Sequence, residues 1–325
     1  MQDQFGRKIE YLRISLTDRC NLRCVYCMPT HAIRRLPRET MLTFEELLRL
    51  VRIFAALGIR RIRLTGGEPL LRPNLPELIA QLCAVDGIEH VALTTNGTLF
   101  SPMAEALKSA GLHAVTFSLD TLRADRFQHI TRSDSFGAVL DGLERAYSLG
   151  FSPIKINCVP LLGINDEDWI SIASLAKHAP LDVRFIELMP IGCAKAYLSV
   201  PTAQVYQCLS AHYGSGKALP HLTGTGPAEY VSFPGFQGRI GFISPMTHSF
   251  CTQCNRVRLT AQGCLRLCLQ KDAGCDLRTL LRSGSDDSTL AGAIQGTILK
   301  KPACHSFSRA AAFSCEESYM HTIGG

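Results

Sequence analysis

The chain has 325 residues, of which 46% are hydrophobic and 19% are charged, a composition typical of a folded globular protein and not of a disordered one. Its net charge of +6 is modest and suits an anionic small molecule as well as a nucleic acid. The N-terminal segment has no apolar signal core and no apolar run could cross a bilayer, so we expect a cytoplasmic protein. In that compartment the 14 cysteines favour metal or cluster ligation over disulfides.

Strands and helices are predicted to alternate through the first two thirds of the chain. Residues 11–17 alternate in hydrophobicity, and Thr43 with Glu46 forms a start signal for a helix that stops at Gly58. We expect further strands at residues 59–65, 89–94, 113–118, 153–158 and 181–187. We expect further helices at residues 73–84, 101–110, 136–149, 166–178 and 201–213. Six strands that alternate with helices predict parallel βα units.

Six units are too few for a closed eight-stranded barrel, so the predicted fold is α/β, an incomplete, three-quarter TIM-like barrel. Ligands of such folds gather at the carboxyl ends of the strands. Past residue 214, glycines and prolines interrupt long elements and the βα alternation stops. We therefore expect a partial barrel over residues 1–214 and a C-terminal domain over residues 215–325.

The most informative motif follows the first predicted strand, where Cys20, Cys24 and Cys27 are separated by three and two residues. A cubane iron–sulfur cluster usually takes four thiolates, so three would leave one iron open to a substrate or cofactor. A structural zinc site needs four ligands, and no fourth one lies nearby in the sequence. We therefore expect an iron–sulfur cluster here, in preference to zinc or buried thiols.

This spacing, with the aromatic Tyr26 just before the last cysteine, resembles the motif of the radical S-adenosylmethionine enzymes. In that family the open iron binds the amino and carboxylate groups of S-adenosylmethionine. The Gly-Gly-Glu-Pro segment at residues 66–69 resembles the family motif that contacts the methionine amino group. Taken alone, the same glycines would suit a plain strand-to-helix turn.

Five basic residues fall within the predicted strands, where charges are rare unless they are paired or line a cavity. They are Arg13, Arg61, Arg63, Lys155 and Arg184. A single strand arginine could form a salt bridge or lie at an edge. Five on four strands favour a barrel interior that binds a polyanion, with each charge-assisted hydrogen bond contributing roughly 1.5–3 kcal/mol.

A second cysteine group lies late in the chain, where Cys251 and Cys254 form a C-x2-C pair and Arg256 and Arg258 follow closely. Further cysteines stand at Cys264, Cys268 and Cys275. The spacing alone leaves zinc and an iron–sulfur cluster equally open.

Taken with these cysteines, the sequence resembles the GTP 3′,8-cyclases of molybdenum cofactor biosynthesis over nearly its whole length. Their auxiliary cluster is held by a C-x2-C-x13-C pattern, which Cys251, Cys254 and Cys268 match. The other matching segments are residues 65–70, 94–97, 117–120, 185–190, 241–246 and the terminal Gly324-Gly325. Cys264 and Cys275 depart from the family pattern and leave the third ligand of the second cluster less secure.

The resemblance implies a role for each matching residue. Two [4Fe-4S] clusters would be held by Cys20, Cys24 and Cys27 and by Cys251, Cys254 and Cys268. S-Adenosylmethionine would contact Tyr26, Gly67, Ser118 and Met189. GTP would contact Arg13, Arg63, Thr94, Lys155, Arg256, Val257 and Arg258, with Arg61 and Arg184 as further candidates. Catalytic roles are expected for Arg256, Arg258, Gly324 and Gly325.

The implied activity is that of a lyase that uses a 5′-deoxyadenosyl radical to convert GTP to (8S)-3′,8-cyclo-7,8-dihydroguanosine 5′-triphosphate. The cluster-bearing C-terminal region would close the open side of the barrel. The implied partners are GTP and an electron donor of the flavodoxin or ferredoxin type, without nucleic acid or membrane; the next enzyme of the pathway and a homodimer are left open. Two other classes are weighed against this one: a different radical S-adenosylmethionine enzyme, such as one that modifies peptides, and a non-catalytic zinc-binding module.

Overall fold

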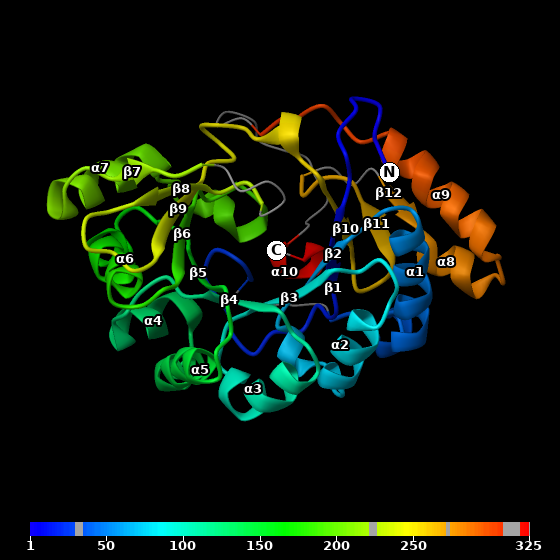
Figure 1. Cartoon of the computed structure of the whole chain (residues 1–325), viewed down its shortest axis with the longest axis horizontal. Helices are drawn as coiled ribbons and strands as arrows, with labels where there is room; N and C mark the ends of the chain where they lie inside the picture. Colours follow the sequence, from blue (N-terminus) through cyan, green and yellow to red (C-terminus); the bar gives the residue numbers. More distant parts are fainter. Residues whose placement is uncertain (30–34, 221–225, 271–273, 308–318, 325) are drawn as a thin grey trace.

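One curved sheet of twelve strands organises the residues described by the structure, a computed structural model that covers residues 1–29, 35–220, 226–270, 274–307 and 319–324 (Figure 1). Six parallel strands lie side by side in chain order at its centre. They are β1 (Tyr11–Ser15), β2 (Arg61–Thr65), β3 (His90–Thr95), β4 (Ala114–Ser118), β5 (Ile154–Cys158) and β6 (Asp182–Ile186). These are the six strands that the sequence predicts.

The C-terminal third of the chain adds strands to both edges of this six-stranded centre. β9 (Arg239–Ile243) runs parallel to β6, and β10 (Arg256–Leu259) runs parallel to β1. Antiparallel strands extend each edge further: β8 (Glu229–Ser232) and β7 (Lys217–Ala218) beyond β9, and β11 (Cys264–Arg266) and β12 (Gly274–Asp276) beyond β10. The sheet stays open between β12 and β7, which confirms the incomplete barrel.

Helices cover the convex face of the sheet (Figure 1). Those of the predicted barrel are α1 (Phe44–Ala56), α2 (Leu75–Cys83), α3 (Phe100–Ser109), α4 (Ala124–Thr131), α5 (Phe136–Ser148), α6 (Trp169–His178) and α7 (Thr202–Tyr213). α8 (Leu277–Arg282) and α9 (Asp287–Leu299) continue this layer beside α1, where Arg49 pairs with Asp287 at 2.8 Å. The short α10 (Met320–Ile323) lies instead within the concavity (Figure 1).

Side chains along each central strand point alternately to the core and to the concave side of the sheet. Leu12, Leu64 and Ile156 are fully buried in the core between the sheet and the helices. Since neighbouring side chains of a strand point to opposite faces, Arg13 and Arg63 face the concavity. Arg13 and Arg63 therefore lie on the concave side of the sheet, where the sequence predicts the strand arginines.

The sequence correctly predicts the start of α1 but gives no indication of α4. Thr43 Oγ1 accepts from the N–H of Glu46 at 3.2 Å, and Glu46 Oε2 accepts from the N–H of Thr43 at 2.9 Å, which is the predicted capping box. α4 was not predicted because only Phe127, Ile130 and Thr131 of its eight residues are buried, which gives too short an apolar pattern.

The division at residue 214 stays a prediction, since this position lies between α7 and β7 and a single sheet continues on both sides of it. Within the described ranges, we find no helix with the length and apolar character needed to span a membrane.

Candidate functional site

A cavity of about 360 Å³ lies at the carboxyl ends of the barrel strands. The loops after β1, β2, β3, β4 and β6 all contribute to its lining, as predicted. The second cysteine group contributes to it as well, together with Met320 and His321 of α10. The two cysteine groups, more than 200 residues apart in sequence, thus face one space.

The N-terminal cysteine loop is held in place by α4. Its three thiols line the cavity: Cys20, Cys24 and Cys27. The backbone N–H groups of Arg23 and Val25 donate to the carbonyls of Thr131 and Ile130 at the end of α4, both at 2.9 Å. Arg23 also donates from Nη1 to the carbonyl of Cys20 at 2.6 Å. The helix that the sequence failed to indicate therefore fixes the most informative motif.

The two glycines after β2 let the backbone of the cysteine loop approach closely. The N–H of Gly67 donates to the carbonyl of Thr17, and that of Glu68 donates to the carbonyl of Arg19, both at 2.7 Å. A β-carbon on residue 67 would lie 2.2 Å from the Arg19 carbonyl oxygen, so only glycine fits. Gly67 also lines the cavity, where the resemblance expects it to contact S-adenosylmethionine.

The buried Glu68 carboxylate connects the loops after β2 and β3. It accepts hydrogen bonds from the N–H of Leu70 at 3.0 Å and from Thr95 Oγ1 and the N–H of Asn96, both at 2.7 Å. Burial raises the pKa of Glu68 to about 7. Asn96 in turn donates from Nδ2 to Cys20 Sγ at 3.7 Å, so this network ends at a candidate cluster ligand.

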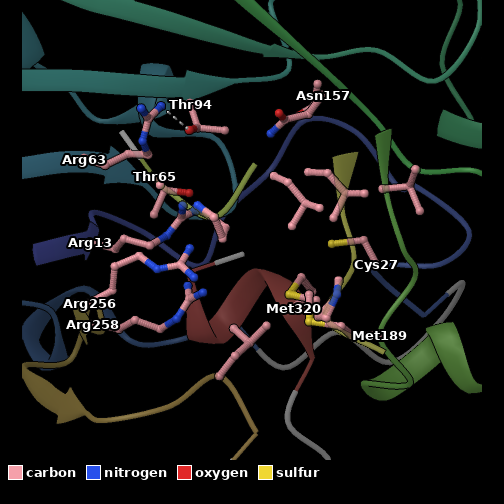
Figure 2. A pocket seen from close by; sticks show the side chains of 18 of the residues that line it. Arg13, Cys27, Arg63, Thr65, Thr94, Asn157, Met189, Arg256, Arg258 and Met320 are labelled. Carbon is pink, nitrogen blue, oxygen red and sulfur yellow. Dashed lines mark hydrogen bonds between the residues drawn. The ribbon is translucent and has the colours of Figure 1, made fainter. Parts of the chain in front are cut away.

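The four residues expected to contact S-adenosylmethionine all line the cavity: Tyr26, Gly67, Ser118 and Met189. Tyr26 donates from its hydroxyl to Asp120 Oδ2 at 2.7 Å, and Asp120 Oδ1 accepts from the N–H of Val159 at 2.8 Å. Figure 2 shows Cys27, Met189 and Met320 together on one side of the cavity, opposite the arginines.

Four arginines form the opposite wall. Arg258, Arg13 and Arg63 are register neighbours on β10, β1 and β2, and with Arg256 they point into the cavity (Figure 2). Arg63 is fixed by hydrogen bonds to Tyr11 Oη at 2.5 Å, Thr94 Oγ1 at 3.2 Å and Thr116 Oγ1 at 2.9 Å. Burial and the charge of Arg256 lower the pKa of Arg258 to about 10. Since neighbouring positive charges repel one another, this arginine wall favours an anion of several charges.

Not all of the predicted substrate residues reach the cavity. Arg184 lines it, but Arg61, Lys155 and Val257 lie outside its lining. Arg61 stands at the amino end of β2, and Val257 is fully buried in the core in register with Leu12. Lys155 is 7% exposed, with its Nζ 3.9 Å from Asp182 Oδ2, and burial together with the charge of Arg184 lowers its pKa to about 7.

The late cysteines separate into two groups. Cys251, Cys254 and Cys268 line the cavity, whereas Cys264 on β11 and Cys275 on β12 lie outside its lining. Burial acts to raise the pKa of the Cys254 thiol, but the charges of Arg256 and Lys301 outweigh it and lower the pKa to about 7. The positions of the thiols therefore favour Cys268 over the other two as the third ligand.

Two buried cations that the sequence did not single out hold this group together. Arg7, paired with Asp3 at 2.6 Å, donates to the carbonyl of Cys251 at 2.7 Å. Lys301 donates from Nζ to the carbonyls of Arg256 at 2.9 Å and Leu267 at 2.5 Å. Neither cation lies in a predicted strand or beside a cysteine in sequence, so no local pattern could have indicated it.

The donor sets fit iron–sulfur clusters better than single metal ions. In the ranges that the structure describes, no three His, Cys, Asp or Glu side chains converge closely enough to hold one ion. The thiols instead line an open volume, which suits a cubane whose irons bind thiolates at separate corners and does not suit a closed tetrahedral zinc site. Burial raises the pKa of the Cys20 thiol to about 11, and that of Cys27 to about 12 with the added effect of Cys20 and Cys193, so cluster ligation would release protons.

The tail residue Gly324 lies beside the arginine wall, where its carbonyl accepts from Arg258 Nη1 at 2.5 Å. Gly325, the other expected tail residue, lies outside the described residues.

Known proteins resemble this chain in both sequence and fold. Residues 14–176 match the Radical SAM superfamily, and residues 181–307 match Molybdenum Cofactor Synthesis C. The chain is 45% identical to the GTP 3′,8-cyclase of Pelotomaculum thermopropionicum, over 94% of this chain and 95% of that protein. It is 44% identical to the GTP 3′,8-cyclase of Syntrophomonas wolfei over 100% of both. A solved structure of Streptococcus suis SuiB bound to S-adenosylmethionine shares the fold, with a TM-score of 0.59 and 14% identity over 89% of this chain and 68% of that one.

Proposed function

We propose, since this chain belongs to the GTP 3′,8-cyclase family within the Radical SAM superfamily, that its cavity converts GTP to (8S)-3′,8-cyclo-7,8-dihydroguanosine 5′-triphosphate. The enzyme is a lyase that uses S-adenosylmethionine and [4Fe-4S] clusters, and its reaction is the first step of molybdenum cofactor biosynthesis. One observation carries the proposal: two three-thiol groups and the arginine wall face the same cavity. A zinc-binding module needs neither feature, and a peptide-modifying enzyme does not need the arginine wall.

In this proposal the two sides of the cavity hold different molecules. Cys20, Cys24 and Cys27 would hold the first cluster, with Tyr26, Gly67, Ser118 and Met189 around S-adenosylmethionine. Together this cluster and S-adenosylmethionine supply a 5′-deoxyadenosyl radical when bound. The hydrogen bond from Tyr26 to Asp120 fixes the tyrosine ring at the edge of that site.

GTP would lie with its triphosphate on the arginine wall and its guanine near Cys251, Cys254 and Cys268. Two orphaned atoms of cavity residues support a polar ligand here: Asn157 Oδ1 and Arg184 Nε are buried without a hydrogen-bond partner in the described part of the chain. Each good contact from an arginine to a phosphate is worth roughly 1.5–3 kcal/mol, so a few suffice to fix the nucleotide.

The chain's own contribution to the reaction is positioning and exclusion of water. Arg63 is preset by its hydrogen bonds to Tyr11, Thr94 and Thr116, so it loses little freedom when it binds a phosphate. Arg256 and Arg258 lie next to the second thiol group, where they can stabilise negative charge on the nucleotide during cyclisation.

The proposal also includes the partners. Reduction of the first cluster calls for a one-electron donor, for which we propose a flavodoxin or ferredoxin type. The cysteines of the described ranges are all free thiols, which suits a reducing compartment, so we propose the cytoplasm. We propose a monomer that acts alone; a homodimer and a contact with the next enzyme of the pathway are the alternatives.

The test uses anaerobically purified protein, dithionite, S-adenosylmethionine and GTP. We expect GTP to disappear and 5′-deoxyadenosine to form in a GTP-dependent manner. ATP, which has the same charges but a different base edge, should bind more weakly and survive. If 5′-deoxyadenosine forms equally with and without GTP and GTP survives, the chain acts on another substrate.

A further inference from the structure

A fourth cysteine lines the cavity beside the second thiol group. Cys304 is exposed and belongs to the same lining as Cys251, Cys254 and Cys268. It is set apart by position from Cys264, which is also exposed but lies on β11 outside the lining. In the described part of the chain, four thiols from its C-terminal third, and not three, therefore line the cavity that would hold the second cluster.

Buried cations attach the segment that carries Cys304 to the second thiol group. Arg7 donates to the carbonyls of Pro302 at 2.6 Å and Ala303 at 3.0 Å, and the Nη1 atom that contacts Ala303 also donates to the carbonyl of Cys251 at 2.7 Å. Two oxygens that share one donor atom lie within a few ångströms of each other. The residue before Cys304 is thus a direct neighbour of a candidate ligand.

The segment is fixed on both sides of Cys304 as well. Lys301 donates to the carbonyls of Arg256 and Leu267, and Leu267 immediately precedes Cys268. On the other side a ring nitrogen of His305 lies 2.7 Å from the carbonyl of Pro245, another cavity residue. Cys304 is therefore held between anchored neighbours, with only its side chain free to turn towards the cavity.

We propose that Cys304 supplies a fourth thiolate to the second cluster while no nucleotide is bound, and that GTP displaces it. The proposal rests on the proposed second cluster. A four-thiolate cluster is closed, so its fourth iron cannot bind another ligand. When GTP enters, the bond from iron to the Cys304 sulfur breaks, the nucleotide takes the vacant position and the released thiolate takes a proton from water. No electron is transferred.

This exchange has a measurable consequence for affinity. A site that is capped most of the time binds substrate with an apparent affinity reduced by the uncapped fraction. Cys304→Ala should therefore tighten GTP binding, by roughly tenfold if the cap is in place nine-tenths of the time. A cysteine that only lines the cavity would give no such gain.

The first measurement isolates the second cluster. In a variant with Cys20, Cys24 and Cys27 all changed to Ala, no turnover occurs, and the reduced second cluster gives the electron paramagnetic resonance and Mössbauer signals. Adding Cys304→Ala should change these signals without nucleotide, and saturating GTP should make the two proteins alike. The matched control, Cys264→Ala, should leave the signals and the GTP affinity unchanged.

Identical nucleotide-free signals and equal GTP affinities with and without Cys304 would overturn the proposal, as would a complete loss of iron from the triple variant. If Cys304→Ala changes the signals but GTP changes neither protein, the cap stands and the proposed substrate is wrong. If GTP changes both proteins equally and Cys304→Ala changes nothing, the proposed function stands and the cap is wrong.

A second measurement uses the protein with both clusters. Anaerobic alkylation with iodoacetamide, followed by peptide mass spectrometry over time, should modify Cys304 much more slowly in the loaded, nucleotide-free enzyme than after the iron is removed. Cys264 should be modified in both states. Modification of Cys304 in the loaded enzyme at the rate seen for Cys264 would contradict the proposal.

Discussion

Lys155 is a buried cation whose proton should respond to a bound anion. Burial lowers its pKa to about 7, and the nearby charges of Arg184 and Arg63 act in the same direction, while Asp182 opposes them. Both arginines line the cavity, and Arg63 belongs to the proposed triphosphate site, so we expect the negative charge of bound GTP to act on Lys155 although its side chain lies outside the cavity lining. A nearby anion favours the charged form and raises the pKa. At pH 8 the Lys155 amine is mostly neutral in the nucleotide-free protein, so it should take up a proton when GTP binds.

The measurement is calorimetric titration of the anaerobic protein with GTP at pH 8, in buffers that differ in ionisation enthalpy. We expect proton uptake approaching one per nucleotide, and a GTP affinity that falls as the pH rises from 7.5 to 9. Lys155→Gln should abolish the uptake. Arg63→Gln should weaken binding by roughly tenfold or more but retain the uptake, because one lost charge-assisted bond costs roughly 1.5–3 kcal/mol.

A substitution of Arg52, which is exposed on α1, serves as the matched control and should change neither quantity. If Lys155→Gln takes up as many protons as the unmodified protein, the triphosphate does not lie near Lys155.

The cysteine loop depends on two neighbouring segments, the loop after β2 and the end of α4. The loop after β2 approaches the backbone of Thr17 and Arg19, and the end of α4 binds the backbone of Arg23 and Val25. Neither contact uses a thiol, so the geometry of the cluster site is set by backbone hydrogen bonds from elsewhere in the fold. This arrangement predicts that a substitution distant from the cysteines in the sequence can prevent the first cluster from binding.

Gly67→Ala is the corresponding test. The new β-carbon would meet the Arg19 carbonyl oxygen at 2.2 Å, so the cysteine loop must shift, and we expect loss of about half of the iron and of S-adenosylmethionine binding. Gly137→Ala, at a helical glycine of α5 with nothing within 4 Å of its β-carbon, is the matched control and should retain both. Iron and acid-labile sulfide analysis of the anaerobic proteins measures the effect. Full iron content with unchanged S-adenosylmethionine affinity in Gly67→Ala would show that the loop tolerates the shift.

The sequence predicts those parts of the fold that depend on interactions between residues close together in the chain. The six central strands, the capping box at Thr43 and the gathering of loops at one end of the sheet follow from periodicity, side-chain chemistry and the crossover rule. α4 could not be predicted because its apolar pattern is too short. β9 and β10 could not be predicted because they pair with strands that are distant in the sequence, and such pairing produces no pattern in the neighbouring residues. Arg7 and Lys301 escaped for the same reason, since their partners are carbonyl groups brought near only by the fold.

The C-terminal third of the chain completes the cavity from both edges of the sheet. β10 places Arg256 and Arg258 beside Arg13 of β1, and β9 extends the opposite edge beside β6. The chain then returns to the concavity, where α10 lies near the arginine wall (Figure 1, Figure 2). The site is therefore assembled from segments spread along the chain, and the C-terminal third supplies the second thiol group and two of the four arginines of the wall.

For the tail, a frayed chain end is the simpler expectation because terminal glycines have high chain entropy and no side chains to pack. In the structure Gly324 instead has a positive φ of 74°, and its carbonyl accepts from Arg258 Nη1. Deletion of Gly324 and Gly325 should leave iron content unchanged but abolish GTP cyclisation, since Arg258 loses the partner that fixes its guanidinium group. Gly324→Ala and Gly284→Ala form a matched pair, because both place an alanine at a residue with positive φ. The new β-carbon at residue 324 would lie 3.1 Å from Ser15 Cβ, whereas the one at residue 284 would have nothing within 4 Å. Activity should fall only in Gly324→Ala, and full activity in the truncated protein would return the tail to a frayed end without a part in catalysis.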